Sequence, residues 1–372
     1  MRVGVPKEVK VHEYRVGLVP ASARELIAHG HQVYVQTGAA DRMGISDDDY
    51  RKVGATVLPN AADVFDVADM IVKVKEPQKA EREMLRQGQT LFTYLHLAPD
   101  PEQAKDLLRS GVTAIAYETV TGARGGLPLL SPMSEVAGRM SIQAGAHCLE
   151  MEQGGRGMLL GGSAGVAPAN VVVIGGGVSG VNAVRMAVGL EAFVTCIDIN
   201  IERLYALDQQ FGASVNTIFS TRQAIEDYVL QADLVVGAVL VPGAAAPKLI
   251  TEDLVRAMRR GSVIVDISID QGGFSETSHP TTHANPSYVT HGVVHYCVAN
   301  MPGAVARTST FALNNATLPF VLALADKGIV EALRSDPHLL AGLNVYQGKI
   351  TYRAVAEALG LAYVDPLVAL NE

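Results

Sequence analysis

The residues with the clearest chemical meaning form a glycine-rich turn after the apolar run Val171–Ile174. The turn reads Gly175-Gly176-Gly177-Val178-Ser179-Gly180, a G-x-G-x-x-G pattern between an expected strand and an expected helix. In such a turn Gly175 allows the tight bend, Gly177 lets the backbone approach a pyrophosphate, and Gly180 lets helix and strand pack closely. Free amides at the helix N-terminus bind the phosphates. The pattern therefore predicts a dinucleotide site.

An acidic residue at the end of the next expected strand indicates which dinucleotide binds. Asp198 ends the run Ala192–Asp198. A carboxylate there accepts hydrogen bonds from the adenosine ribose hydroxyls and repels a 2′-phosphate, which favours NAD over NADP. The alternative is that Asp198 only caps the following turn. Arg203 could hold a 2′-phosphate, so NADP stays open.

Other cofactor contacts are expected where further strands end, because ligands of open parallel sheets lie at the carboxyl ends of the strands. Small or polar residues interrupt apolar runs at Val239-Leu240, Ser268-Ile269-Asp270 and Ala299-Asn300-Met301. Asp270 would face the nicotinamide end of the cofactor. The alternative is an ordinary turn aspartate before Gly272-Gly273.

Three residues of the N-terminal part could bind or protonate a small substrate. Lys75 ends the expected strand Asp69–Lys75, and His96 lies next to last in the expected strand Gln89–Leu97. A lysine can polarise a carbonyl, and a histidine can exchange protons at neutral pH. Arg15, in the loop after the first strand, could pair with a carboxylate through two hydrogen bonds. The alternatives are a solvated strand end for Lys75, a structural histidine for His96 and a solvated loop arginine for Arg15.

Four histidines in one stretch suggest a metal site at first sight, but the pattern does not support one. Pro280 and Pro286 interrupt any helix there, and no cysteine or acid has matching spacing. We therefore expect no structural metal at His279, His283, His291 and His295.

The elements that must position these residues alternate between strands and helices, which implies parallel sheets with crossover helices. Helices are expected between the strands, over Ser131–Glu152 and again after about Arg307. The expected strands are Arg2–Val5, His31–Gln36, Asp69–Lys75, Gln89–Leu97, Gly111–Glu118, Asn170–Gly175, Ala192–Asp198, Asp233–Leu240, Ser262–Ile269 and Val293–Val298.

The predicted fold class is α/β, with two doubly wound domains. A length of 372 residues suggests about two and a half domains. The C-terminal helical stretch is too short for a third domain, so we assign it to the first. The prediction is a discontinuous, flavodoxin-like substrate domain, residues 1–128 and 307–372, around a Rossmann NAD-binding domain, residues 129–306.

Composition excludes several classes of protein. The net charge is −8 and no basic run exceeds two residues, which argues against nucleic-acid binding. The apolar stretches are interrupted by proline, glycine or asparagine, so no membrane-spanning helix is expected. Three cysteines without paired spacing and a start without an apolar signal segment favour the reducing cytoplasm. Hydrophobic residues make up 48% of the chain and charged residues only 18%, and the apolar surplus is assigned to strands buried on both faces and to subunit contacts.

Beyond these separate signals, the chain resembles the alanine dehydrogenase family, which includes the transhydrogenase α-subunit, over nearly its whole length. The resemblance rests on the following motifs: Gly4-Val5-Pro6-Lys7-Glu8, Glu13-Tyr14-Arg15-Val16, Val72-Lys73-Val74-Lys75-Glu76-Pro77, Tyr94-Leu95-His96-Leu97, Ser131-Pro132-Met133-Ser134-Glu135-Val136-Ala137-Gly138, the glycine turn, Asp270-Gln271-Gly272-Gly273, His291-Gly292-Val293-Val294-His295-Tyr296 and Asn300-Met301-Pro302-Gly303.

The resemblance implies roles for particular residues. Arg15 and Lys75 would hold the substrate, and His96 and Asp270 would be the catalytic acid/base groups. It also implies NAD as cofactor, reversible conversion of L-alanine to pyruvate and ammonia, and a hexamer of identical chains. The implied NAD contacts are Ser134, Gly175, Gly177, Val178, Ser179, Gly180, Asp198, Arg203, Ser220, Val239, Leu240, Ile267, Ser268, Ile269, Asp270, Val298, Ala299, Asn300 and Met301.

The sequence departs from the family pattern at three positions. Ser179 and Glu191 stand where small apolar residues or glycine are usual; Ser179 is small, and Glu191 is expected in a surface turn. His279 replaces a longer basic side chain, which puts a cofactor contact at that position in doubt.

Three other functions stay open. The chain could be a different amino-acid dehydrogenase of the wider family, for example one that forms secondary amines. It could be the nucleotide-binding part of a proton-translocating transhydrogenase, although the combination of Arg15, Lys75, His96 and Asp270 favours an enzyme with its own substrate. A nonenzymatic NAD sensor would bind NADH without turnover of alanine.

Overall fold

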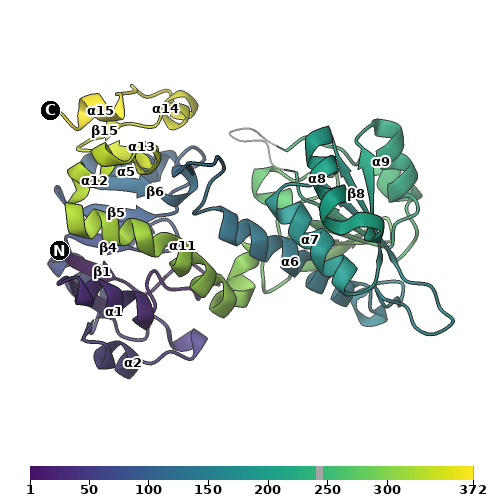
Figure 1. The fold of residues 1–372 in the computed structure, drawn as a ribbon, viewed down its shortest axis with the longest axis horizontal. Helices are drawn as coiled ribbons and strands as arrows, with labels where there is room; N and C mark the ends of the chain where they lie inside the picture. The colour runs from purple at the N-terminus through teal and green to yellow at the C-terminus, as the bar shows by residue number, and fades with distance from the viewer. Residues whose placement is uncertain (240–245, 372) are drawn as a thin grey trace. The chain divides into compact units, whose positions relative to one another are not determined.

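In a computed structural model that describes residues 1–239 and 246–371, the chain divides into two compact units (Figure 1). The first unit comprises Met1–Met133 and Val305–Glu372, and the second comprises Ser134–Ala304. Leu240, one of the expected cofactor contacts, lies outside the described residues. No helix in the described ranges has the length and apolar character needed to cross a membrane.

The first unit is built on an eight-stranded sheet of order β15-β14-β6-β5-β4-β1-β2-β3. The six strands β1 to β6 are parallel to one another, and β14 and β15 continue the sheet beyond β6 in antiparallel pairing. Without the edge strand β3, the parallel strands follow the flavodoxin-like order 2-1-3-4-5. The strands are β1 (Arg2–Val5), β2 (Gln32–Gln36), β3 (Thr56–Leu58), β4 (Met70–Val72), β5 (Thr90–Thr93), β6 (Thr113–Ala116), β14 (Leu343–Tyr346) and β15 (Lys349–Ile350).

Helices of the N-terminal and C-terminal segments cover this sheet together. Figure 1 shows α1 and α11 side by side. Asn314 of α11 is buried, and its side chain accepts from the Val19 amide (2.8 Å) and donates to the Val16 carbonyl (3.3 Å), so the C-terminal segment is hydrogen-bonded to the first loop. The helices are α1 (Pro20–Ala28), α2 (Asp47–Lys52), α3 (Ala61–Val67), α4 (Lys79–Arg82), α5 (Pro101–Ser110), α11 (Ala306–Lys327), α12 (Ile329–Ser335), α13 (Pro337–Leu340), α14 (Arg353–Leu359) and α15 (Pro366–Ala369).

The second unit is built on a seven-stranded sheet of order β12-β13-β11-β10-β7-β8-β9. Its six parallel strands follow the dinucleotide-binding order 3-2-1-4-5-6, and β12 is antiparallel at one edge. The two sheets confirm the predicted α/β architecture. The strands are β7 (Asn170–Ile174), β8 (Phe193–Asp198), β9 (Val215–Phe219), β10 (Leu234–Gly237), β11 (Val263–Asp266), β12 (Ser287–Thr290) and β13 (Val293–Tyr296), and the helices are α6 (Ser131–Cys148), α7 (Val178–Gly189), α8 (Ile201–Phe211), α9 (Arg222–Val229) and α10 (Glu252–Ala257).

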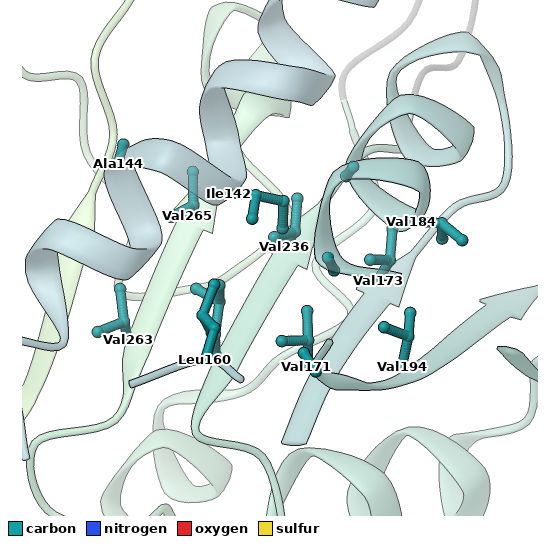
Figure 2. Close-up of a cluster of buried hydrophobic side chains, with 14 of the residues drawn as sticks. Ile142, Ala144, Leu160, Val171, Val173, Val184, Val194, Val236, Val263 and Val265 are labelled. Carbon is teal, nitrogen blue, oxygen red and sulfur yellow. The ribbon is translucent and has the colours of Figure 1, made fainter. Parts of the chain in front are cut away.

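Both faces of the second sheet are buried, as the continuous apolar runs predict. On one face, Val171 and Val173 pack with Ile142 of α6 and Val184 of α7 (Figure 2). On the other face, Val172 and other strand residues pack against α9 and α10. The helices α6 and α7 approach closely at Gly138, where a Cβ atom would lie 2.0 Å from the Ser179 carbonyl oxygen.

The strands that lead to the expected site residues are shorter than the apolar pattern predicts. β4 ends at Val72 and β5 at Thr93, so Lys75 and His96 lie in the loops that follow and not within strands. The apolar run continues because the loop residue Leu95 is itself buried. The pattern therefore reports burial correctly but overestimates strand length.

Candidate active site

The glycine turn has a different steric requirement at each of its three positions. Gly175 has φ +98°, and a Cβ atom there would lie 2.6 Å from the Ala238 carbonyl oxygen. At Gly180, a Cβ atom would lie 1.7 Å from the Gly175 carbonyl oxygen, so the helix and the turn can pack only around glycine. At Gly177, a Cβ atom would meet nothing within 4 Å. Gly177 is also the N-cap of α7 and provides no side chain to bind the first amides. The turn therefore offers open space and free donors, which fit a pyrophosphate.

Asp198 is fixed next to this turn. Its carboxylate accepts from the Gly176 amide (2.5 Å) and from the Asn200 amide (2.7 Å), so it contacts both the glycine turn and the turn that follows β8. Arg203 of α8 donates through Nε to the Gly176 carbonyl. The Ser220 amide donates to the Asp198 carbonyl (3.0 Å), which places Ser220 beside the end of β8. The acid and the arginine thus contact the same residue of the turn, Gly176, through its amide and its carbonyl.

The other expected cofactor residues follow the carboxyl ends of neighbouring parallel strands. Ser268 donates to the Val239 carbonyl (2.7 Å), which joins the segments after β11 and β10. The side chains of Val298 and Met301 are buried, so a contact from these two residues would come through the backbone. Ser134 lies one helical turn before Gly138 on α6 and so faces the same side as the close contact with α7. The remaining expected residues near these strand ends are Ile267, Ile269, Asp270, Ala299 and Asn300.

Asp270 lies exposed in a short 3-10 helix, Ile267–Gln271, directly after β11. The buried residue Asp266, directly before this helix, connects its start to the chain after it, because the Asp266 carboxylate accepts from the Phe274 amide (3.0 Å). Burial raises the pKa of Asp266 to about 6. Sequence reasoning missed Asp266, although an acid within an apolar run is a recognisable signal.

In the first unit, Lys75 and His96 follow adjacent parallel strands. The Thr93 hydroxyl donates to the Lys75 carbonyl (2.9 Å), and the Tyr94 amide donates to the Val74 carbonyl (3.2 Å). These bonds continue the β4–β5 pairing beyond the strands and place both residues just after the carboxyl ends of these two strands. The Lys75 side chain is partly buried, whereas the His96 side chain is 44% exposed.

A buried ionic cluster, Glu8, Lys73 and Glu81, holds the backbone of Lys75. The Lys73 ammonium lies 3.1 Å from Glu8 Oε2 and 2.6 Å from Glu81 Oε1, and all three side chains are at most 3% exposed. Glu8 Oε1 accepts from the amides of Val74 (2.7 Å) and Lys75 (3.3 Å). Burial raises the pKa of Glu8. Burial opposes the charge of Lys73, but the two carboxylates raise its pKa above the ordinary value.

Arg15 is buried and is not the solvated loop residue that the alternative describes, because only 1% of its side chain is exposed. Its Nε and Nη2 atoms donate to the two carboxylate oxygens of Glu13, at 2.7 and 2.5 Å. The paired carboxylate fixes the plane of the guanidinium.

Sequence reasoning treated Glu8 and Glu13 only as parts of motifs, and it gave Glu81 and Glu118 no role. Glu118 ends the expected strand Gly111–Glu118, and its carboxylate accepts from the His96 amide (2.6 Å). The signal that could have found it is its place at the carboxyl end of the strand beside β5.

The four histidines of the second unit each have a different partner. His283 contacts the Asn300 carbonyl (3.1 Å), His291 contacts Glu252 (2.7 Å) and His295 contacts the Thr277 hydroxyl (2.8 Å). His279 stacks on the ring of Tyr288 at 3.8 Å. Within residues 1–239 and 246–371, no group of three or more histidine, cysteine or acidic side chains is arranged to hold a metal ion.

Comparison with known proteins gives consistent results. The alanine dehydrogenase/PNT N-terminal domain matches residues 4–137, and the corresponding C-terminal domain matches residues 141–353. An alanine dehydrogenase of Halomonas elongata is 62% identical over 365 residues, 98% of each chain. A solved structure of an L-alanine dehydrogenase is 52% identical, with a TM-score of 0.94 over 97% of this chain and 99% of its own. A transhydrogenase structure from Sinorhizobium meliloti is 24% identical, with a TM-score of 0.82 over 94% of this chain and 100% of its own, and it shows the fold alone.

Proposed function

The chain belongs to the alanine dehydrogenase/PNT family, and on this premise we propose that it catalyses the NAD-dependent oxidative deamination of L-alanine to pyruvate and ammonia, and the reverse reductive amination. The observation that carries the proposal is the 62% identity, over 98% of both chains, with a relative named alanine dehydrogenase. A dehydrogenase that acts on an amino acid also accounts for a nucleotide turn and a set of acid, base and cationic groups in one chain.

Several features of the second unit support NAD as the cofactor in this proposal. The open space at Gly177 and the uncapped start of α7 suit the pyrophosphate, and the Asp198 carboxylate suits the ribose hydroxyls. NAD⁺ bound there would supply the acceptor for the hydride that leaves the substrate Cα atom. Arg203 donates to the turn, and the neighbouring negative charge of Asp198 disfavours a 2′-phosphate, so NAD is preferred to NADP in the proposal.

In the proposed reaction, the residues of the chain bind the substrate and move protons. Arg15 anchors the carboxylate of alanine, and Lys75 polarises the C=N and C=O groups that form at Cα. His96 accepts a proton from the water that attacks the imine and transfers protons as the resulting carbinolamine releases ammonia. Asp270 orients the amine and stabilises cationic intermediates. The balance is alanine, NAD⁺ and water to pyruvate, ammonium, NADH and a proton.

An absorbance assay of NADH formation tests this proposal directly. Purified protein is mixed with NAD⁺ and, separately, alanine, serine, glycine or 2-aminobutyrate, and the formation of NADH is followed. We expect the highest kcat/KM with alanine. Turnover of a different amino acid alone would identify another dehydrogenase of the family. NADH binding without turnover would leave the sensor or transhydrogenase functions.

We also propose that the protein assembles as a homohexamer in the cytoplasm. Met151, Leu159 and Val166 of the second unit are between 61% and 72% exposed, which suits contacts between subunits. Cys148, Cys196 and Cys297 are buried, free thiols, as in a protein of a reducing compartment. Size-exclusion chromatography with light scattering measures the assembly, and a monomer would refute the oligomer without affecting the enzymatic proposal.

A further inference from the structure

His96 has an unusual backbone conformation. Its φ is +49°, in the left-handed region that residues other than glycine rarely adopt. Residues are held in this region only when the surrounding structure imposes it, and such residues concentrate at functional sites. The backbone conformation of a residue sets the direction of its Cα–Cβ bond, so the group that imposes this conformation also influences where the imidazole ring lies.

The structure identifies that group as Glu118. Glu118 lies in a short 3-10 helix, Tyr117–Thr119, directly after β6, the strand beside β5. Its carboxylate accepts from two successive amides: the His96 amide at 2.6 Å, and the Leu95 amide at 3.2 Å to each oxygen. A turn with one residue in the left-handed region lets successive amides converge on one anion, and charge-assisted bonds of this kind are stronger than neutral ones.

The same carboxylate faces the histidine ring. Glu118 Oε1 lies 3.9 Å from Nδ1 of His96, and the Glu118 side chain is only 14% exposed. The ring of Tyr94 lies nearly parallel to the imidazole, at 6° and 5.8 Å between centroids. Because Nδ1 is directed toward Glu118, Nε2 is the nitrogen left to exchange protons with a substrate. Within the described residues, Glu118 forms no ion pair with lysine or arginine, so its charge acts on the His96 turn.

We propose that Glu118 is a positioning residue for His96, which holds residues 95–96 in their turn and presents Nε2 of the imidazole for proton transfer. When His96 takes up a proton during the reaction, the imidazolium and the Glu118 carboxylate form an ion pair. The inference rests on the proposed function, since it assigns His96 to proton transfer.

Three variants test the inference in the alanine assay. Glu118→Ala removes both amide contacts and the charge, whereas Glu118→Gln keeps an acceptor oxygen of nearly the same shape. We expect Glu118→Ala to lower kcat by about 100-fold, the loss typical of a misplaced catalytic group. The KM for alanine and the Kd for NADH should change by less than about 3-fold, because other residues bind these ligands. Glu118→Gln should recover part of the rate. Glu102→Ala, at an exposed position of α5, is the matched control and should retain full activity.

A double variant separates positioning from a general structural role. If Glu118 acts through His96, then Glu118→Ala combined with His96→Ala should be no slower than His96→Ala alone. A further tenfold loss in the double variant, or a kcat within about twofold of the parent for Glu118→Ala, would overturn the inference.

A readout that does not depend on turnover keeps the inference separate from the proposed function. In spectra of ¹⁵N-labelled histidine, Glu118→Ala should shift the His96 ring signals toward a mixture of tautomers, whereas Glu102→Ala should not. If the parent protein lacks alanine turnover, the proposed function fails. If the parent is active and the His96 signals of Glu118→Ala are unchanged, the inference fails.

Discussion

Replacement of Lys73 by methionine should destabilise the first unit through the buried ionic cluster. The ammonium lies 3.1 and 2.6 Å from carboxylate oxygens of Glu8 and Glu81. At an effective dielectric constant of about 20, each contact corresponds to about 5 to 6 kcal/mol of attraction, most of which offsets the cost of removing the ions from water. Removal of one partner of a buried pair costs about 3–5 kcal/mol, because the remaining charge has no compensation. Here two carboxylates would remain, so we expect the upper part of that range at pH 8.

The effect of Lys73→Met should depend on pH in a defined direction. The pKa of Glu8 is raised by burial, and loss of the cation raises it further. A carboxylate with a raised pKa in the folded state contributes most stability when protonated, and this contribution is lost as the pH rises through the folded-state value. The destabilisation should therefore shrink between pH 8 and pH 5. The raised pKa of Lys73 keeps the parent cation charged throughout this range.

Differential scanning calorimetry at pH 5 and pH 8 measures this prediction, with far-UV circular dichroism as a second probe because the chain contains no tryptophan. The triple variant Lys73→Met, Glu8→Gln and Glu81→Gln should recover much of the loss, since no unpaired charge remains. Lys105→Met, at an exposed pair on α5, is the control and should melt like the parent. Equal melting temperatures of Lys73→Met and the parent at pH 8 would refute the reasoning, and so would a destabilisation that grows toward pH 5.

Three further outcomes are expected. His96→Ala should lower the kcat for alanine deamination by about 1,000-fold, to a small residual rate, and leave the Kd for NADH, measured by fluorescence titration, near the parent value; unimpaired turnover would reject its role as a proton-transfer group. Gly177→Ala should weaken NADH binding without a change in melting temperature, because its Cβ would enter the open space assigned to the pyrophosphate. Gly180→Ala should lower both the NADH affinity and the melting temperature, since its Cβ would lie 1.7 Å from a backbone oxygen. Identical effects of the two variants would contradict the assignment. Burial raises the pKa of Asp266 to about 6, so its ionisation costs stability as the pH rises from about 4 through 6. The melting temperature of Asp266→Asn, compared with that of the parent, should therefore be more favourable at pH 7.5 than at pH 4.5. A difference in melting temperature that does not depend on pH would exclude this explanation.

The sequence by itself determined the α/β class and the turn chemistry of the second unit. The glycine turn could be recognised locally, because the positive φ of Gly175, the N-cap position of Gly177 and the close approach at Gly180 all arise within a single strand, turn and helix. The position of Asp198 is also a local signal, because it ends the next strand along the chain. Strands that are buried on both faces could also be predicted from a local pattern, since such burial produces continuous apolar runs.

Only the tertiary structure decided how the groups of the first unit are held. Lys73 and Glu8 are 65 residues apart in the sequence, and Leu95 and Glu118 are 23 residues apart, so no local pattern links them. Their contacts depend on which strands are neighbours, and on a buried charge being stable only when an opposite charge lies beside it. The left-handed conformation of His96 is likewise linked to the carboxylate of Glu118, which follows the adjacent strand β6. The sequence could name Lys75 and His96 as candidates, but the glutamates that position them became visible only when β1, β4, β5 and β6 came together in one sheet.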